Sequence, residues 1–202
     1  MSLTAFLRRV VEILDEAGVP YMLTGSLASA YYATPRATQD LDVVIGTEEA
    51  GIEQVVQGLQ DSGWYVDRNA ALEAQRTRGQ FNAIDPSSGW KVDFIVRKDR
   101  TYSRIEFERR ERVSLLDIEV AIASLEDVLI AKFEWSQLGD SALQRRDVLQ
   151  LLERTWERID HAYVEKWVAE LGLRSEWEDA RRKVLEEAKD ELRRAYGRPA
   201  EA

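Results

Sequence analysis

Two aspartates alternate with apolar residues in the segment Asp40–Ile45, which reads DLDVVI. Since residues i and i+2 of a strand project to the same face, a strand here places the Asp40 and Asp42 carboxylates side by side. The apolar residues that follow are typical of an interior strand of a sheet. Two adjacent anions repel each other unless a cation lies between them. The segment therefore predicts either a cation site or an exposed strand end with two solvated aspartates.

A glycine and a serine precede this segment at a predicted turn from strand to helix. Residues 21–24 are strand-like, and residues 27–33, LASAYYA, form an apolar helix that ends before Pro35. A glycine at such a turn lets the backbone approach a ligand closely, and the helix N-terminus offers N–H groups to an anion. Gly25 and Ser26 are therefore candidates for a phosphate cradle, and a plain helix cap is the alternative explanation.

A third aspartate interrupts the apolar, strand-like segment 90–96, WKVDFIV. An aspartate inside a core strand is unfavourable unless it is paired or bound to a metal. If this strand lies beside Asp40–Ile45, Asp93 completes a set of three carboxylates, as a metal ligand or as the general base for an attacking hydroxyl. The alternative is a solvent-facing position on a half-exposed strand. Carboxylate-rich sites suit Mg²⁺ or Mn²⁺, which also bind substrate phosphates.

Composition narrows the chemistry further. The 202 residues include no cysteine and one histidine, which excludes a disulfide framework and a thiol nucleophile and argues against a multi-histidine zinc site. A formal net charge of −9 disfavours a non-specific nucleic-acid coat. Because no apolar run reaches the length of a membrane span and the first segment is amphipathic, we expect a cytoplasmic protein without membrane contact.

The character of the predicted elements changes near residue 123. Residues 1–123 mix helices and strands, including a hairpin around the turn residues 85–89, whereas residues 124–202 are predicted to be helical. We expect an α+β fold with a mixed sheet flanked by helices, followed by a C-terminal helical region packed on that core. The predicted helices are 3–17, 27–33, 48–62, 69–75, 102–109, 124–137, 141–156, 161–171 and 175–196. The predicted strands are 21–24, 40–45, 64–66, 80–84, 90–96, 113–116 and 118–122.

These motifs resemble a known family. Gly25-Ser26, then Asp40-x-Asp42 about fourteen residues later, then a strand aspartate at Asp93, are similar to the signature of the nucleotidyltransferase fold of the DNA polymerase β type. The resemblance implies a metal-dependent enzyme in which the aspartates hold two divalent ions, Mg²⁺ or Mn²⁺, that bind the incoming nucleoside triphosphate. A hydroxyl acceptor, on a small molecule, RNA or protein, attacks the α-phosphorus of a nucleoside triphosphate, and pyrophosphate leaves. It implies Asp40 and Asp42 as metal ligands and Asp93 as a ligand or the base.

The helical part resembles one bacterial branch of that family, the minimal and AbiEii-like nucleotidyltransferases, some of which are toxins of toxin–antitoxin pairs. The matching segments are LEDVLIAKFEW at 125–135 and QRRDVL at 144–149. That branch has a lysine on one helix and an Arg-Asp pair on the next, which implies that Lys132 neutralises triphosphate charge and that Asp147 orients Lys132 or binds the ribose or base. Surface salt bridges explain the same residues. The implied nucleotide-binding residues are Gly25, Ser26, Arg36, Lys132 and Asp147.

The sequence leaves two macromolecular partners as alternatives, RNA and a second protein. The stretch Arg97–Arg112 holds seven basic and four acidic residues, so it is +3 in a chain of −9. Because it follows the Asp93 strand, one interpretation is contact with RNA phosphates beside the active site, and the other is a solvated helix of mixed charge. The second class of function is a non-catalytic nucleotide-binding or toxin–antitoxin-type protein on the same fold. In that case Trp167, Val168 and Leu171 would form an interface with a protein partner.

Overall fold

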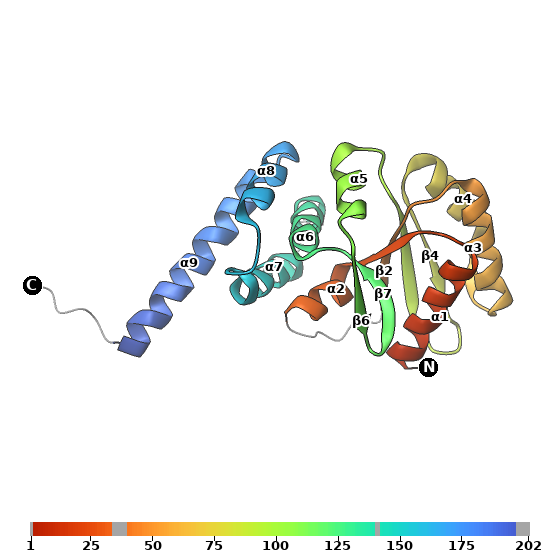
Figure 1. Cartoon of the computed structure of the whole chain (residues 1–202), viewed down its shortest axis with the longest axis horizontal. Helices are drawn as coiled ribbons and strands as arrows, with labels where there is room; N and C mark the ends of the chain where they lie inside the picture. The colour runs from red at the N-terminus through yellow and green to blue at the C-terminus, as the bar shows by residue number, and fades with distance from the viewer. Residues whose placement is uncertain (1, 34–39, 140–141, 197–202) are drawn as a thin grey trace, which may run out of the picture. The chain divides into compact units, whose positions relative to one another are not determined.

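The computed structural model describes residues 2–33, 40–139 and 142–196 (Figure 1). The chain separates into two compact units. The first unit runs to Ser124 and the second begins at Leu125, except that Tyr32 and Ala33 group with the second unit. No helix within the described ranges is long and apolar enough to cross a membrane.

Within the described residues, the first unit holds a seven-stranded mixed sheet with the order β3-β4-β5-β2-β1-β7-β6. Strand β2 is parallel to β5 and antiparallel to β1, and β1 is parallel to β7. The strands are β1 (Tyr21–Thr24), β2 (Asp40–Ile45), β3 (Tyr65–Val66), β4 (Gln80–Ile84), β5 (Lys91–Val96), β6 (Glu111–Leu115) and β7 (Ile118–Ile122). The helices of this unit are α1 (Leu3–Glu16), α2 (Gly25–Tyr32), α3 (Glu49–Asp61), α4 (Arg68–Thr77) and α5 (Thr101–Glu108). The predicted mixed sheet flanked by helices is confirmed.

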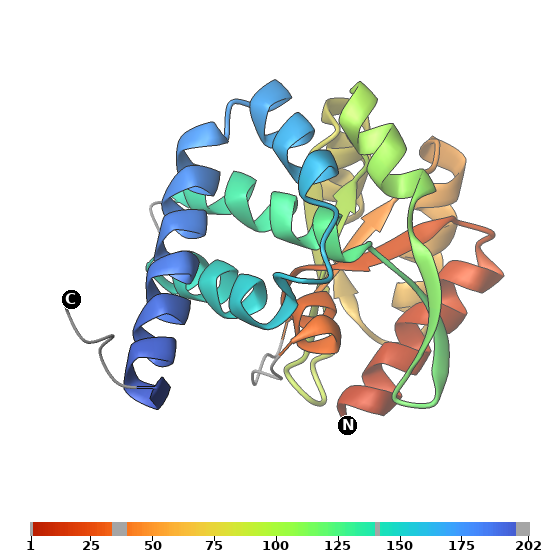
Figure 2. The same ribbon diagram turned by 60° about the vertical axis from the view of Figure 1, so that its left-hand side comes forward.

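The alternation in β2 separates a buried face of the sheet from a polar one. Its odd-numbered residues are buried, whereas Asp40 is exposed and Asp42 and Val44 are partly exposed. Helices α1, α3 and α4 lie along one side of the sheet (Figures 1 and 2). In this layer Phe6 of α1 stacks on Trp64 and Trp90, with ring centroids 4.8 and 5.6 Å apart. This packing fixes the strands from one side and leaves the aspartates of β2 on the other.

Strand β6 starts two residues earlier than the sequence predicts. Its hairpin with β7 closes through Leu116 and Asp117, whose φ angles of 53° and 60° are both left-handed. A two-residue turn with two left-handed residues usually carries Asn or Gly, because those residues adopt this conformation at little cost. Neither is present here, so the sequence pattern places Leu116 in the strand.

The second unit consists of helices (Figure 2). Aromatic side chains pack between them. Trp177 stacks on Trp156 and meets Phe133 edge-on, with centroids 6.1 and 6.2 Å apart. Trp167 and Val168 are only 3% and 1% exposed, so the suggestion that they form an interface with a partner is wrong: they belong to the interior. The helices are α6 (Leu125–Gly139), α7 (Ala142–Thr155), α8 (His161–Glu170) and α9 (Arg174–Tyr196).

Candidate active site

The turn from β1 into α2 brings backbone and carboxylate together. Gly25, the first residue of α2, has a φ of 63°, which an L side chain adopts at a cost of about 1–2 kcal/mol. A Cβ atom on Gly25 would lie only 1.9 Å from Oδ2 of Asp42. Both the conformation and the space therefore require glycine at this position. Ser26 follows on the half-buried first turn of α2 and takes part in interactions within the protein.

A row of polar residues crosses four strands next to this turn. In the register of the sheet, Thr24 of β1 pairs with Asp42 of β2, Asp42 pairs with Asp93 of β5, and Asp93 pairs with Asn82 of β4. Residues paired in this way point to the same face of a sheet. The strand of Asp93 therefore lies beside the strand of Asp40 and Asp42, the arrangement on which the predicted set of three carboxylates depends.

Lys91 is a site residue that the sequence reasoning missed. It pairs with Asp40 across β2 and β5, and its Nζ lies 2.9 Å from Oδ2 of Asp93 and 3.5 Å from Oδ1 of Asp40. The hydrogen bond to Asp93 raises the pKa of Lys91 above its ordinary value, although burial of the ammonium acts in the opposite direction. Strand periodicity places Lys91 on the face of Asp93, two residues away, but its contact with Asp40 depends on the pairing of β2 with β5.

The carboxylates have the donor chemistry of a Mg²⁺ or Mn²⁺ site, but they are not arranged as a shared triad. Across the described part of the chain, no group of three or more acidic, histidine or cysteine residues is placed to hold a metal ion. Asp40 and Asp93 instead converge on the Lys91 ammonium, which stands where a cation would otherwise balance them. Asp40 and Asp42 thus fit a divalent ion by chemistry, while Lys91 engages Asp93 closely and Asp40 at a longer distance.

Lys132 and Asp147 face each other inside the second unit. Lys132 Nζ on α6 donates to Asp147 Oδ2 on α7 over 3.1 Å, and the two side chains are only 5% and 11% exposed. The pair is a salt bridge, as the alternative supposes, but it is not at the surface, because Lys132 is buried and Asp147 is largely covered. Arg36, the remaining predicted nucleotide-binding residue, lies outside the described residues.

The basic stretch Arg97–Arg112 makes many contacts within the protein. The guanidinium groups of Arg97 and Arg110 lie over the Phe107 ring at 5.6 and 4.3 Å from its centroid. Burial, followed by the charges of Arg112 and Arg97, lowers the pKa of Arg110. Arg104 pairs with Asp99 at 2.6 Å, and Arg100 and Arg109 donate to serine hydroxyls.

A cleft of about 470 Å³ opens beside part of this stretch. Arg110 and Arg112 line it together with Tyr21, which starts β1 at the end opposite Gly25. Burial and the charge of Asp15 raise the pKa of Tyr21, while a backbone hydrogen bond involving Ala121 opposes them. The acidic residues Glu108 and Glu119 also line the cleft, so it carries both signs of charge.

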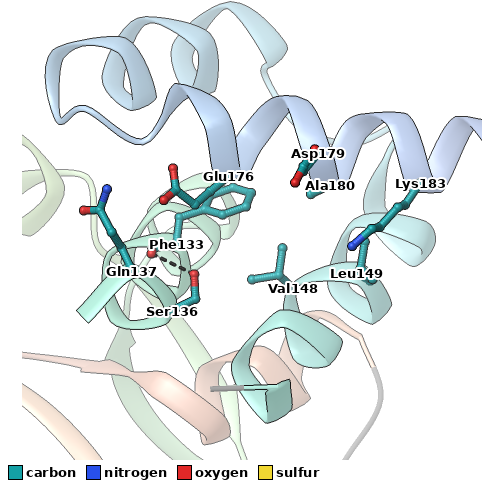
Figure 3. A pocket seen from close by; sticks show the side chains of 9 residues that line it. All are labelled: Phe133, Ser136, Gln137, Val148, Leu149, Glu176, Asp179, Ala180 and Lys183. Atoms are coloured by element: carbon teal, nitrogen blue, oxygen red, sulfur yellow. Dashed lines mark hydrogen bonds between the residues drawn. The ribbon is translucent and has the colours of Figure 1, made fainter. Parts of the chain in front are cut away.

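A second pocket, of about 320 Å³, lies among α6, α7 and α9 (Figure 3). Phe133 and Val148 form part of an apolar floor, and Glu176, Asp179 and Lys183 of α9 line it with charged groups. None of these five residues was predicted as a site residue, because the sequence of an amphipathic helix does not show where packed helices leave a pocket between them.

Neither a protein-family model nor a curated protein sequence matches this chain. Solved structures do match it. The antibiotic-resistance factor ANT(2'')-Ia in solution gives a TM-score of 0.56 at 13% identity, over 93% of this chain and 97% of that one. A crystal structure of ANT(2'')-Ia in complex with adenylyl-2''-tobramycin gives 0.56 at 14% identity, over 88% and 99%. The chain has the nucleotidyltransferase fold.

The lincosamide antibiotic adenylyltransferase LnuA, in a lincomycin-bound crystal structure, is a further nucleotidyltransferase of this shape. Its TM-score is 0.51 at 13% identity, over 75% of this chain and 96% of that one. At identities this low, the structural similarity establishes the nucleotidyltransferase fold but neither the activity nor the substrate. The predicted fold is thus confirmed, and the roles of individual residues and the AbiEii-like branch remain predictions.

Proposed function

We propose that the chain is a metal-dependent nucleotidyltransferase that moves an NMP from a nucleoside triphosphate to a hydroxyl acceptor and releases pyrophosphate. The observation that carries this proposal is the polar row in which Asp42 lies beside Asp93 and against the Gly25 turn. Carboxylates beside the start of a helix provide, in one place, oxygen ligands for a divalent ion and N–H donors for phosphate. Transfer of a nucleotide from a triphosphate needs both.

The residues divide into roles by their chemistry. Asp40 and Asp42 would hold the divalent ion, which when bound supplies charge neutralisation to the triphosphate. Backbone N–H groups of the α2 N-terminus at Gly25 and Ser26 donate to the β- and γ-phosphate oxygens. The acceptor oxygen bonds to the α-phosphorus as the bond to pyrophosphate breaks. Asp93 is a further ligand or the base that accepts the hydroxyl proton.

Lys132 and Asp147 extend the proposal to the helical unit. We assign Lys132 to the triphosphate as a point positive charge, and Asp147 to holding the Lys132 ammonium in one position. Their pairing at 3.1 Å supports the second role. Arg36 is retained as a further phosphate contact. Lys132 and Asp147 are also the residues on which we propose that the chain belongs to the minimal and AbiEii-like branch.

For the acceptor we propose a small hydroxyl-bearing molecule. ANT(2'')-Ia is bound to adenylyl-2''-tobramycin and LnuA to lincomycin, and both structures share the fold of this chain. The guanidinium groups of the Arg97–Arg112 stretch that contact Phe107, Asp99 or serine hydroxyls are engaged within the protein, which weakens the case for RNA. RNA and protein acceptors are the alternatives, and a pyrophosphate-release assay compares RNA with small molecules.

A thermal-shift series tests nucleotide binding. ATP, GTP, CTP and UTP are added with and without Mg²⁺ to the wild type and to Asp42→Asn. A ligand at about ten times its Kd adds roughly 1.4 kcal/mol of stability, or about 3–5 °C for a chain of this size. We expect a Mg²⁺-dependent shift for at least one nucleotide, and its loss in Asp42→Asn.

Pyrophosphate release then tests turnover. The nucleotide that gives the shift is incubated with tobramycin, lincomycin or total RNA, and the wild type is compared with Asp42→Asn. Release that needs Asp42 and one class of acceptor supports the proposal and identifies that class. Turnover that survives Asp42→Asn, or no shift with any nucleotide, contradicts it and favours the partner-binding alternative.

A further inference from the structure

Lys91 provides a positive charge inside the carboxylate site itself. It lies on β5 in register with Asp40 and two residues before Asp93, so all three side chains share one face of the sheet. Its ammonium contacts Asp93 at 2.9 Å and Asp40 at 3.5 Å. One ammonium therefore joins the two parallel strands that carry the three aspartates.

The position differs from that of an ordinary surface ion pair. The Lys91 and Asp93 side chains are 33% and 21% exposed, and the Lys91 ammonium serves two carboxylates at once. Asp42 lies next to Asp93 in the register, so like charges would crowd this face without Lys91. The lysine therefore reduces the repulsion that a divalent ion would otherwise have to relieve.

The Lys91 ammonium limits how many divalent ions these carboxylates can accept. Among the described residues it places one positive charge between Asp40 and Asp93. A second divalent cation at these two carboxylates would lie against the ammonium and be repelled by it. The carboxylates, moreover, do not form a group of three around a common point in the described residues.

We propose that the Lys91 ammonium takes the place of one of two divalent cations, so that the chain binds a single divalent ion through Asp40 and Asp42. This inference rests on the proposed nucleotidyltransferase function, because it concerns the metal site of that function. Of the two roles proposed for Asp93, this inference leaves that of the base, because its carboxylate is bound to Lys91 and not to the ion.

The number of bound ions tests the proposal directly. Mn²⁺ alone is titrated into the full chain, and the free ion is counted by electron paramagnetic resonance at saturation. The variants are Lys91→Met, which removes the charge, Lys91→Arg, which keeps it, and Lys98→Met, a matched control on an exposed residue of the following loop. We expect one Mn²⁺ per chain for the wild type, Lys91→Arg and Lys98→Met, and two for Lys91→Met.

Each outcome has a definite meaning. Two ions in the wild type, or one ion in a folded Lys91→Met variant, overturns the proposal. The wild-type count decides the matter even if Lys91→Met does not fold, and circular dichroism reports whether it does. Two Mn²⁺ in a wild type that still shows a nucleotide-dependent shift overturns the Lys91 inference and leaves the proposed function standing. Absence of both Mn²⁺ binding and the nucleotide shift overturns the proposed function as well.

Discussion

The Asp42 carboxylate lies against the backbone of Gly25 so closely that a Cβ atom on Gly25 would come within 1.9 Å of Oδ2. Gly25→Ala therefore has to move Asp42 and also place alanine at a φ of 63°. We expect a loss of about 1–2 kcal/mol from the backbone alone, with a further loss from the displaced carboxylate. Urea unfolding measures the stability, and the Mg²⁺–nucleotide thermal shift is expected to vanish.

Gly18→Ala is the matched control for that prediction. Gly18 has a nearly identical φ of 61°, and among the described residues no atom beyond its chain neighbours lies within 4 Å of the Cβ position. It carries the backbone cost without the clash, so its unfolding free energy should fall less and its nucleotide shift should persist. Equal losses of unfolding free energy in the two variants would mean that the close contact between Gly25 and Asp42 adds nothing to the cost of the backbone conformation.

The buried pair of Lys132 and Asp147 gives a second prediction. Asp147→Ala leaves the Lys132 ammonium, whose side chain is 5% exposed, without its carboxylate partner. Removing one member of a buried ion pair costs about 3–5 kcal/mol. The double variant Lys132→Met/Asp147→Leu should lose much less than the sum of the single changes, since it removes both charges of the pair together. Urea unfolding of the two single variants and the double variant measures the coupling.

The pair of Arg181 and Glu165 is the surface comparison. Its atoms are 3.4 Å apart and its side chains 50% and 51% exposed. Arg181→Ala is expected to change the unfolding free energy by about 1 kcal/mol or less, as exposed pairs generally do. If Asp147→Ala changed stability no more than Arg181→Ala, the burial of the Lys132 pair would not be contributing to the fold.

Strand periodicity predicted the side of the sheet on which the aspartates lie. Asp40 and Asp42 share a face because they are two residues apart, and the buried residues Leu41, Val43 and Ile45 share the opposite face by the same rule. The sequence did not predict that the Asp93 strand lies beside β2, since no local pattern fixes which strands become neighbours. The set of three carboxylates was therefore predicted only on the assumption that the two strands are adjacent. The parallel register of Asp42 with Asp93 arises from the whole sheet.

Two parts of the site were beyond local patterns for different reasons. Lys91 has the same two-residue spacing from Asp93 that identified Asp40 and Asp42, but a lysine near a strand end ordinarily points to solvent. Its role appears only when the β2 and β5 strands are paired. Burial of Lys132 likewise depends on how α6 meets α7, because charged residues on an amphipathic helix are exposed by default.

The hairpin of β6 and β7 offers a stabilising change. Leu116 and Asp117 both adopt left-handed φ angles, and Leu116 is 42% exposed, so its side chain contributes little to the core. Replacing the two residues by Asn and Gly, the pair preferred in such turns, is expected to raise the unfolding free energy by about 0.5–2 kcal/mol. Thermal unfolding checks it, and an unchanged or lower Tm would contradict the assigned turn conformation.

The turn between β4 and β5 predicts a pH dependence. Burial of Asp85 raises its pKa, but hydrogen bonds from the Ser88 and Ser87 side chains and from the Ser87 backbone outweigh burial and hold the pKa below the ordinary 3.8. The charged form of Asp85 therefore stabilises the fold above about pH 3.8. This contribution is lost as the pH falls through the pKa that Asp85 has in the folded protein, which is lower than 3.8.

We therefore expect Asp85→Asn to lower the unfolding free energy at pH 7 by about 1–3 kcal/mol, the usual value of hydrogen bonds to a charged group. The difference from wild type should shrink at pH 3, where the carboxylate starts to be neutralised. Urea unfolding followed by tryptophan fluorescence at both pH values measures it, with Asp61→Asn on the exposed end of α3 as the control. A difference that stays the same at pH 7 and pH 3 would mean that the charge on Asp85 plays no part in holding the turn.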